Sequence, residues 1–254
     1  MLRILKIGGN VLVDPQALDQ TLSLFASYES PAILVHGGGR EASDLLKKMG
    51  HEAKMVNGRR ITDAATLEVV TMVYAGLINK QLVAQLQAKN CNALGVSGAD
   101  GNLIQAHKRV VKEIDYGFAG DIDAINTAGF KSLLEGGFFP VCCAITHDKQ
   151  GQLLNTNADT IASSIAVALV AAYEVELLYC FEKPGVLQDA EDDASVIEHI
   201  HPGSYAELKQ QGVVHSGMLP KLDNAFAAIA NGVRAVYVGN LESLQSGRAT
   251  RLSL

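Results

Sequence analysis

The sequence predicts an α/β fold in which a mainly parallel sheet is covered by helices on both faces. Two observations predict it. Short continuous apolar runs alternate with helical patterns, and glycine-containing loops follow several of these runs. Continuous apolar strands are typical of parallel sheets that are buried on both faces, and such sheets bind ligands at the carboxyl ends of their strands. A chain of 254 residues suits one large α/β domain or two small lobes that share a sheet.

The expected strands are short and separated by helices. Strands are predicted at residues 2–7, 32–35, 92–96, 138–145, 175–180 and 235–238, and weak alternation over 103–115 indicates a hairpin. The first helix begins at Asp14-Pro15, because Asp suits the N-cap and Pro suits the first helical position. Further helices are predicted after Gly39 through Leu46, from Thr62 to Leu82, and over 122–134, 158–172 and 221–230.

Composition excludes some classes of function. The net charge of −6 disfavours non-specific binding to nucleic acid or anionic membranes, which needs an excess of Lys and Arg. No apolar run approaches the roughly 18 residues of a membrane span, and Arg3 and Lys6 interrupt the start of the chain where a signal peptide would need an apolar run. The four cysteines form no C-x-x-C pair and are interpreted as reduced core thiols. We therefore expect a cytoplasmic protein.

Lys6 is the first candidate for chemistry. It lies near the end of the first predicted strand, and Gly8-Gly9 follows directly. A buried lysine costs free energy unless its charge is used, and glycine lets backbone amides approach an anion. The alternative is a lysine at an edge strand whose ammonium reaches solvent.

The second candidate is the loop His36-Gly37-Gly38-Gly39, between a strand and a helix N-terminus. Exposed amides and the helix dipole favour an anion there. The pattern Gly37-x-Gly39-x-x-Ala42 also fits the dinucleotide fingerprint, but the required acidic residue after the next strand is missing, and no Gly-Lys-Ser/Thr of a Walker A motif occurs. His36 is interpreted as structural.

Two further segments place polar residues at helix starts. Arg60, in Asn57-Gly58-Arg59-Arg60-Ile61-Thr62, is the kind of residue that binds a carboxylate with two hydrogen bonds, although on this segment alone a surface arginine is the better explanation. In Asn155-Thr156-Asn157-Ala158-Asp159, capping accounts for one side chain, and three alternate polar residues exceed what one cap needs.

Lys221 is the last candidate residue for chemistry. Pro220 places it in the first turn of a helix, where the helix dipole disfavours a cation, so a local anion is indicated.

Together these segments resemble the amino-acid kinase family, in particular its branch that phosphorylates N-acyl-L-glutamate. The matching stretches occur in the family's order: Lys6-Ile7-Gly8-Gly9-Asn10, Val35-His36-Gly37-Gly38-Gly39, Asn57-Gly58-Arg59-Arg60-Ile61-Thr62, Asn155-Thr156-Asn157-Ala158-Asp159 and Gly217-Met218-Leu219-Pro220-Lys221. The resemblance covers essentially the whole chain. It implies a three-layer α/β/α sandwich with an open, mainly parallel sheet, as one domain over 1–254 with an acylamino-acid lobe (1–172) and a nucleotide lobe (173–254).

The resemblance also implies roles for individual residues. Lys6 and Lys221 would stabilise the transferring phosphoryl group, with Asp159 organising the two lysines. The acylglutamate contacts would be Gly38, Gly39, Arg60 and Asn155. The nucleotide contacts would be Gly8, Gly9, Glu182, Lys183, Pro184, Gly185, Val186, Leu187, Val213, Val214 and His215. The chain departs from the pattern at Glu182, where Asp is usual, and at Ser216, where Gly or Asp is usual.

The implied reaction uses ATP with Mg²⁺ carried by the nucleotide, without protein metal ligands, to convert a γ-carboxylate to an acyl phosphate in arginine biosynthesis. A carboxylate with a reference pKa of about 4.3 is already an anion at pH 7, so no general base is required. The substrate is expected to be N-acetyl-L-glutamate, with N-succinyl-L-glutamate as the alternative. Carbamate, aspartate, glutamate 5- and uridylate kinases share the framework, and a non-catalytic sensor and a dinucleotide-dependent oxidoreductase are more remote readings.

Assembly is also predicted. Arginine-inhibited members of the family carry an N-terminal helix that links dimers into a hexamer. Here residues 1–5 precede Lys6, which at ~1.5 Å per residue is little over one helical turn. We therefore expect a homodimer that is insensitive to arginine. The helix from Thr62 to Leu82 is a candidate dimer surface, although burial against its own sheet explains its apolar row equally well.

Overall fold

The computed structural model describes residues 1–56, 59–214 and 218–254, apart from the side chain of Pro220. The chain forms two compact units, one from Met1–Ala32 with Ala162–Leu254 and the other from Ile33–Ile161. These units do not coincide with the predicted lobes, because the first strand pairs in parallel with residues 175–180 and so groups with the C-terminal part. Which substrate each lobe binds stays a prediction.

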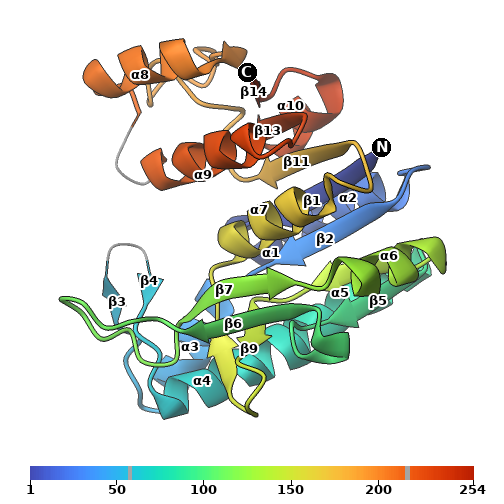
Figure 1. Cartoon of the computed structure of the whole chain (residues 1–254). Coiled ribbons are helices and arrows are strands. Elements are labelled where there is room, and N and C mark those ends of the chain that lie inside the picture. The colour runs from blue at the N-terminus through green and yellow to red at the C-terminus, as the bar shows by residue number, and fades with distance from the viewer. Residues whose placement is uncertain (57–58, 215–217) are drawn as a thin grey trace. The chain divides into compact units, whose positions relative to one another are not determined.

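The first unit is built on parallel strands (Figure 1). Its strand order is β12 (His199–Ile200), β14 (Thr250–Leu252), β13 (Ala235–Gly239), β11 (Val175–Cys180) and β1 (Leu2–Ile7). Only the β13–β14 pair among these is antiparallel. Its helices are α1 (Gly9–Val13), α2 (Pro15–Ala26), α8 (Pro202–Gln210), α9 (Leu219–Ala230) and α10 (Leu241–Ser246). All six residues of β11 are buried, as expected for a strand covered on both faces.

The second unit contains the parallel strands β2 (Ala32–His36), β8 (Phe139–Cys142) and β5 (Ala93–Val96). A second sheet has the order β10 (Leu153–Asn155), β9 (Ile145–His147), β6 (Ile104–Lys108) and β7 (Gly120–Ile125), and β3 (Met55–Val56) pairs with β4 (Arg59–Arg60). The helices are α3 (Gly39–Lys48), α4 (Ala64–Thr71), α5 (Asn79–Ala88) and α6 (Thr127–Glu135), with a 3₁₀ turn at Asp100–Asn102. Helix α7 (Ala158–Leu169) contributes residues to both units.

The predicted α/β class with a mainly parallel sheet is confirmed, and so are several local predictions. Strands form over 2–7 and 175–180 as expected. The Asp14 side chain accepts hydrogen bonds from the backbone amides of Gln16 and Ala17, which makes it the N-cap of α2. Of the described helices, none is long and apolar enough to cross a membrane.

The predicted helix over 122–134 is wrong in its first part. Residues 120–125 form β7, which pairs with β6, and the helix begins only after Asn126, whose side chain accepts from the amide of Gly129. The alternation of Asp121 and Asp123 with apolar neighbours is the strand signal there. The hairpin predicted at 103–115 therefore closes with β7, across a loop at 109–119.

Two other predicted elements are divided. Residues 138–145 form two strands, since β8 ends at Cys142 and β9 begins at Ile145. The long helix after Thr62 is capped by Asp63, whose side chain accepts from the amide of Thr66 at 2.8 Å. A π-helical segment, Met72–Ile78, separates α4 from α5 within that helix. Such segments occur often at functional sites.

Candidate functional site

The glycine loop after β2 has a conformation that requires glycine. Gly38 has φ of +149° and caps α3. A Cβ atom added to it would lie 2.3 Å from Cδ1 of Ile78 and 2.9 Å from Cδ1 of Tyr74, both from the π-helical segment. The π segment thus packs directly against the loop and fixes the backbone amides at the start of α3. These amides and the helix dipole form an anion-binding arrangement.

His36 supports this loop from inside the core. Its side chain is fully buried, and burial lowers its pKa to about 4, so it is neutral at pH 7. Asn79 donates through Nδ2 to Nε2 of His36 at 3.1 Å and to the carbonyl of Val141 at 2.9 Å. Because Nε2 accepts, Nδ1 carries the proton and donates to the carbonyl of Gly37 at 2.8 Å. This agrees with the structural role expected for His36, whereas sequence reasoning missed Asn79.

Arg60 lies on β4, buried to 8 % exposure, and reaches the glycine loop. Its Nη2 donates to the carbonyl of Gly39 and to Oγ of Ser43, both at 2.8 Å. Its Nη1 is buried and has no hydrogen-bond partner among the described residues. Tyr74 lies nearby, and burial raises the pKa of this phenol while the Arg60 cation opposes the rise. The structure thus brings Gly39 and Arg60 together and leaves one guanidinium nitrogen for an anionic ligand.

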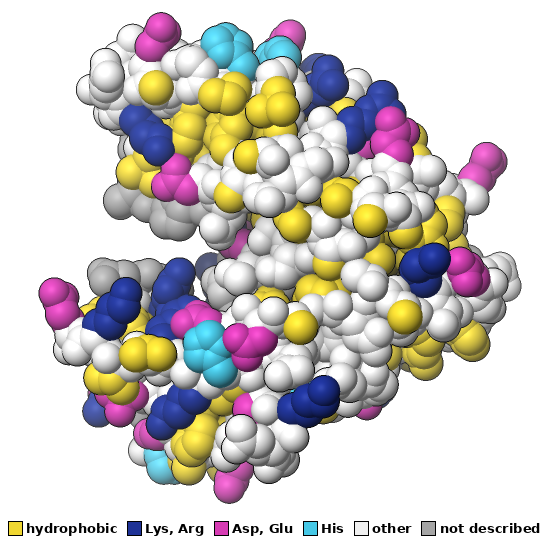
Figure 2. All heavy atoms as spheres, viewed as in Figure 1, with side chains coloured by type: hydrophobic (Ala, Val, Ile, Leu, Met, Phe, Trp, Pro, Cys, Tyr) yellow, Lys and Arg dark blue, Asp and Glu magenta, His cyan; other side chains and the backbone are white. Residues whose placement is uncertain are grey.

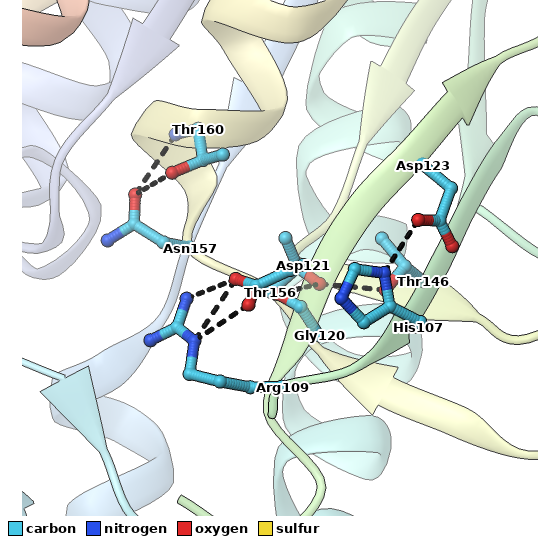
Figure 3. A network of polar contacts seen from close by, with 9 residues as sticks. All are labelled: His107, Arg109, Gly120, Asp121, Asp123, Thr146, Thr156, Asn157 and Thr160. Carbon is cyan, nitrogen blue, oxygen red and sulfur yellow. Dashed lines mark hydrogen bonds and ion pairs between the residues drawn. The ribbon is translucent and has the colours of Figure 1, made fainter. Parts of the chain in front are cut away.

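Asn155 ends β10 and is linked to the same arginine. Its Nδ2 donates to Oγ1 of Thr62 at 3.0 Å, and Thr62 Oγ1 donates to the carbonyl of Arg60 at 3.3 Å. Asn157 caps α7 by accepting from the amide of Thr160 at 3.0 Å (Figure 3). Asp159 stands in the first turn of α7, where the helix dipole favours a carboxylate. Asn155 and Asn157 therefore bind different partners, Thr62 and the backbone of Thr160.

The two predicted catalytic lysines both belong to the first unit. Lys6 is buried near the end of β1, and a Cβ atom added to Gly8 would lie 3.9 Å from its Nζ. The amide of Gly8 donates to the carbonyl of Cys180 at 3.2 Å, and Gly9 begins α1. Lys221 stands in the first turn of α9 as predicted. Asp159 belongs to the second unit.

The two predicted nucleotide segments line one pocket of about 130 Å³ in the first unit. Its lining is mostly apolar and consists of Lys183, Gly185, Val186, Leu187, Ala190, Val213, Val214 and Met218. A Cβ atom on Gly185 would lie 2.6 Å from Oγ1 of Thr250, and the amide of Val186 donates to that oxygen at 2.8 Å. Apolar walls with a few polar groups suit the ring of a nucleotide base. His215, predicted for the same site, lies outside the described residues, as do Asn57, Gly58, Ser216 and Gly217.

Glu182 and Pro184 do not line this pocket. Glu182 lines a separate one of about 310 Å³, together with Asn10, Asp14, Phe181 and Glu242 among others. The carbonyl of Pro184 lies beside Gly239, where an added Cβ atom would approach it to 2.7 Å. Lys183 forms an ion pair with Asp193 at 2.8 Å, and both side chains are exposed. The nucleotide-binding role of Glu182 and Pro184 stays a prediction.

A larger pocket of about 610 Å³ lies in the second unit and was not predicted. Arg59, Arg109 and Lys112 line it, and Figure 2 shows Lys and Arg side chains gathered at the β3–β4 end of this unit. Arg109 donates through Nε to both carboxylate oxygens of Asp121 at 3.1 Å and through Nη2 to Oδ1 (Figure 3). These hydrogen bonds hold the pKa of Asp121 below its usual range. The described residues contain no group of three or more His, Cys, Asp or Glu side chains that could hold a metal ion.

A family model and named relatives match nearly the whole chain. A model of the amino acid kinase family matches residues 1–240. Acetylglutamate kinase of Cytophaga hutchinsonii is 53 % identical over 244 residues, which cover 96 % of this chain and 92 % of that protein. Acetylglutamate kinase of Phocaeicola vulgatus is 50 % identical over 249 residues, with 98 % and 97 % covered.

Solved structures share the fold. The protein smu.665 of Streptococcus mutans has a TM-score of 0.79 at 25 % identity, and the match covers 99 % of this chain and 98 % of that one. Giardia carbamate kinase has a TM-score of 0.70 at 14 % identity, with the same coverage. At that identity, the second match indicates the fold alone.

Proposed function

Because the chain belongs to the amino acid kinase family, we propose that it transfers the γ-phosphoryl group of ATP to the γ-carboxylate of N-acetyl-L-glutamate. The product is an acyl phosphate, an activated carboxylate for arginine biosynthesis. Relatives that match almost the full length and are named acetylglutamate kinase support the substrate. A cytoplasmic location stays the prediction made from the sequence.

One observation in the structure carries the proposal: Arg60 is buried at the glycine loop with Nη1 unpartnered among the described residues. In our proposal the α-carboxylate of the acylamino acid accepts from this guanidinium, and Asn155 assists. A planar fork suits a carboxylate better than an ammonium does. The amides of Gly38 and Gly39 provide further donors at the start of α3. The substrate is thereby oriented with its γ-carboxylate as the nucleophile.

The transfer itself needs charge stabilisation rather than a base. A γ-carboxylate is already ionised at pH 7, and the transferring phosphoryl group spreads negative charge over its equatorial oxygens. We propose that Lys6 and Lys221 stabilise this charge, together with the amide of Gly9 at the start of α1. The organising role of Asp159 toward the lysines stays a prediction from the resemblance.

We propose that the base of the nucleotide occupies the apolar pocket of the first unit. Val186, Leu187, Val213 and Val214 would hold the adenine ring there. Mg²⁺ bound to the ATP phosphates would neutralise part of their charge. Magnesium often binds through substrate phosphates with few protein carboxylates, so the chain needs no carboxylate cluster of its own.

A substrate panel tests the proposal. The protein is incubated with MgATP and one acceptor, and the acyl phosphate formed is trapped as its hydroxamate. The acceptors are N-acetyl-L-glutamate, N-succinyl-L-glutamate, L-glutamate, carbamate and L-aspartate. With UMP as the acceptor, the ADP formed from ATP is measured instead. We expect the highest kcat/KM with N-acetyl-L-glutamate. A higher kcat/KM with N-succinyl-L-glutamate would show that the preferred substrate carries a succinyl group, while the proposed reaction would stand. Turnover of none of the acylglutamates would refute the proposal.

We also propose a homodimer. Met72 and Leu77 of the long helix between 64 and 88 each expose about half of their apolar side chains. Burying such residues against a second copy is favourable. Light scattering should give twice the chain mass of 27.0 kDa, and Leu77→Glu should yield a monomer. Lys131→Glu, on helix α6, is the charge control and should remain dimeric.

A further inference from the structure

A buried hydroxyl group of the Asn155–Asp159 motif, that of Thr156, is paired with the buried hydroxyl of Thr146 (Figure 3). Oγ1 of Thr156 is 2.7 Å from Oγ1 of Thr146 on β9 and 3.3 Å from the carbonyl of Gly120 on β7. Thr146 is fully buried, and Thr156 is 3 % exposed. We propose that Thr156 is a positioning residue whose hydroxyl sets Asn155 for the acylamino acid. This inference rests on the proposed function of the same site.

Whichever of the two threonines donates to the other, both hydroxyl protons are engaged in hydrogen bonds. If Thr146 donates to Thr156, then Thr156 donates to the carbonyl of Gly120. If Thr156 donates to Thr146, then Thr146 donates to the carbonyl of Leu154 at 3.4 Å. Each hydroxyl has one proton and two acceptor positions, so both arrangements are complete. Thr156 takes part in both, and its hydroxyl ties the motif to two other strands.

Strand β7 approaches the hydroxyl pair closely at Gly120. A Cβ atom on Gly120 would lie 2.5 Å from Oγ1 of Thr156, 2.9 Å from Cβ of Leu154 and 3.0 Å from Oγ1 of Thr146. Glycine at this position therefore lets β7 approach the hydroxyl pair closely. Because the packing around this polar pair is close, removal of either hydroxyl is expected to shift the neighbouring residues.

Backbone hydrogen bonds hold the chain on either side of the Thr156 side chain. The amide of Thr156 donates to the carbonyl of Ala144 at 3.1 Å, and the amide of Asn155 donates to that of Phe118 at 2.9 Å. The chain leaves β10 at this point and enters α7 two residues later. A rotation at Thr156 would displace Nδ2 of Asn155 from Thr62 and would also shift the start of α7. Position 156 thus controls both ends of the motif.

The test compares four single variants. Thr156→Val removes the hydroxyl and keeps the side-chain shape, and Thr156→Ser restores the hydroxyl. Thr146→Val removes the partner but leaves Thr156 able to donate to Gly120. Thr21→Val is the matched control, since Thr21 is also fully buried but belongs to the first unit, where its Oγ1 donates to the carbonyl of Ala17 at 2.7 Å and its side chain is hydrogen-bonded to Cys180.

For Thr156→Val we expect the KM for N-acetyl-L-glutamate to rise about three- to tenfold, the range that the loss of one hydrogen bond implies. The KM for ATP should stay within twofold, because the nucleotide pocket belongs to the other unit. Thr156→Ser should recover most of the loss, and Thr146→Val should show a smaller rise. Thr21→Val should leave the KM for N-acetyl-L-glutamate unchanged, because Thr21 belongs to the other unit.

Amide hydrogen exchange of the peptide spanning 153–161, measured without substrate, gives a readout that does not depend on activity. Exchange should be faster in Thr156→Val and normal in Thr156→Ser. Equal exchange and equal KM in Thr156→Val and the wild type would overturn the inference, as would a serine variant as impaired as the valine variant. If the wild type turned over no acylglutamate, the proposed function would fail, while the exchange rates would still decide whether Thr156 holds the motif.

Discussion

Replacing Arg60 by lysine tests the carboxylate site most directly. The guanidinium uses Nη2 for the carbonyl of Gly39 and Oγ of Ser43, and it keeps Nη1 buried toward the proposed ligand. A lysine has one nitrogen in place of this fork, so it cannot keep the loop contacts and bind a carboxylate in the same geometry. The charge is conserved, so the change isolates the geometry of the donors.

The expected increase in KM for the acylamino acid follows from the number of hydrogen-bond donors lost. One hydrogen bond to a charged group contributes about 1.5–3 kcal/mol, which corresponds to a KM increase of about tenfold to 150-fold. Steady-state kinetics should show this increase for the acylamino acid and a change within twofold for ATP. Ser43→Ala removes only one acceptor of Nη2 and should raise the same KM by less than threefold.

Arg59→Lys is the matched control for this experiment. Arg59 precedes Arg60 on β4 but is exposed, and it faces the pocket formed with Arg109 and Lys112. Both KM values should be unchanged in this variant. Equal effects of the two substitutions, or an equal rise of both KM values in Arg60→Lys, would place the carboxylate site elsewhere.

Three further predictions concern charge, backbone and pH. Lys6→Ala and Lys221→Ala should each lower kcat about 10²- to 10³-fold with smaller KM changes, and near-normal turnover would remove them from the catalytic site. Gly38→Ala should reduce the free energy of unfolding by at least about 2 kcal/mol through positive φ and overlap with Ile78. Gly50→Ala, with φ of +80° but open space around it, should cost only about 1 kcal/mol in denaturant titrations. The pKa of His36 is lowered from 6.5 to about 4 in the folded state, so the unfolded state binds more protons between these values. Stability should therefore fall by up to about 3 kcal/mol as the pH drops through this window, and a pH-independent unfolding free energy there would contradict it.

The sequence by itself determined the class of fold and the segments that carry chemistry. Continuous apolar runs predicted β1 and β11, and Asp14-Pro15 predicted the start of α2, because these signals depend on neighbouring residues alone. The glycine loop and the lysines at an element's end or start were likewise recognisable from local sequence. The boundary between β7 and α6 was misplaced, because the alternation at 120–125 acquires meaning only through pairing with β6.

Tertiary structure decided what those segments contact. The local sequence around Arg60 is by itself typical of a surface arginine. In the structure, β4 approaches α3 and buries Arg60 against Gly39. Asn79 and Thr146 carry no local signal, since each becomes informative through a partner at least ten residues away. The local sequence also did not predict that β1 groups with the C-terminal strands, because this grouping results from the pairing of residues 2–7 with residues 175–180. Hydrogen bonds between distant segments depend on how the chain folds back on itself, and no local pattern of residue types specifies them.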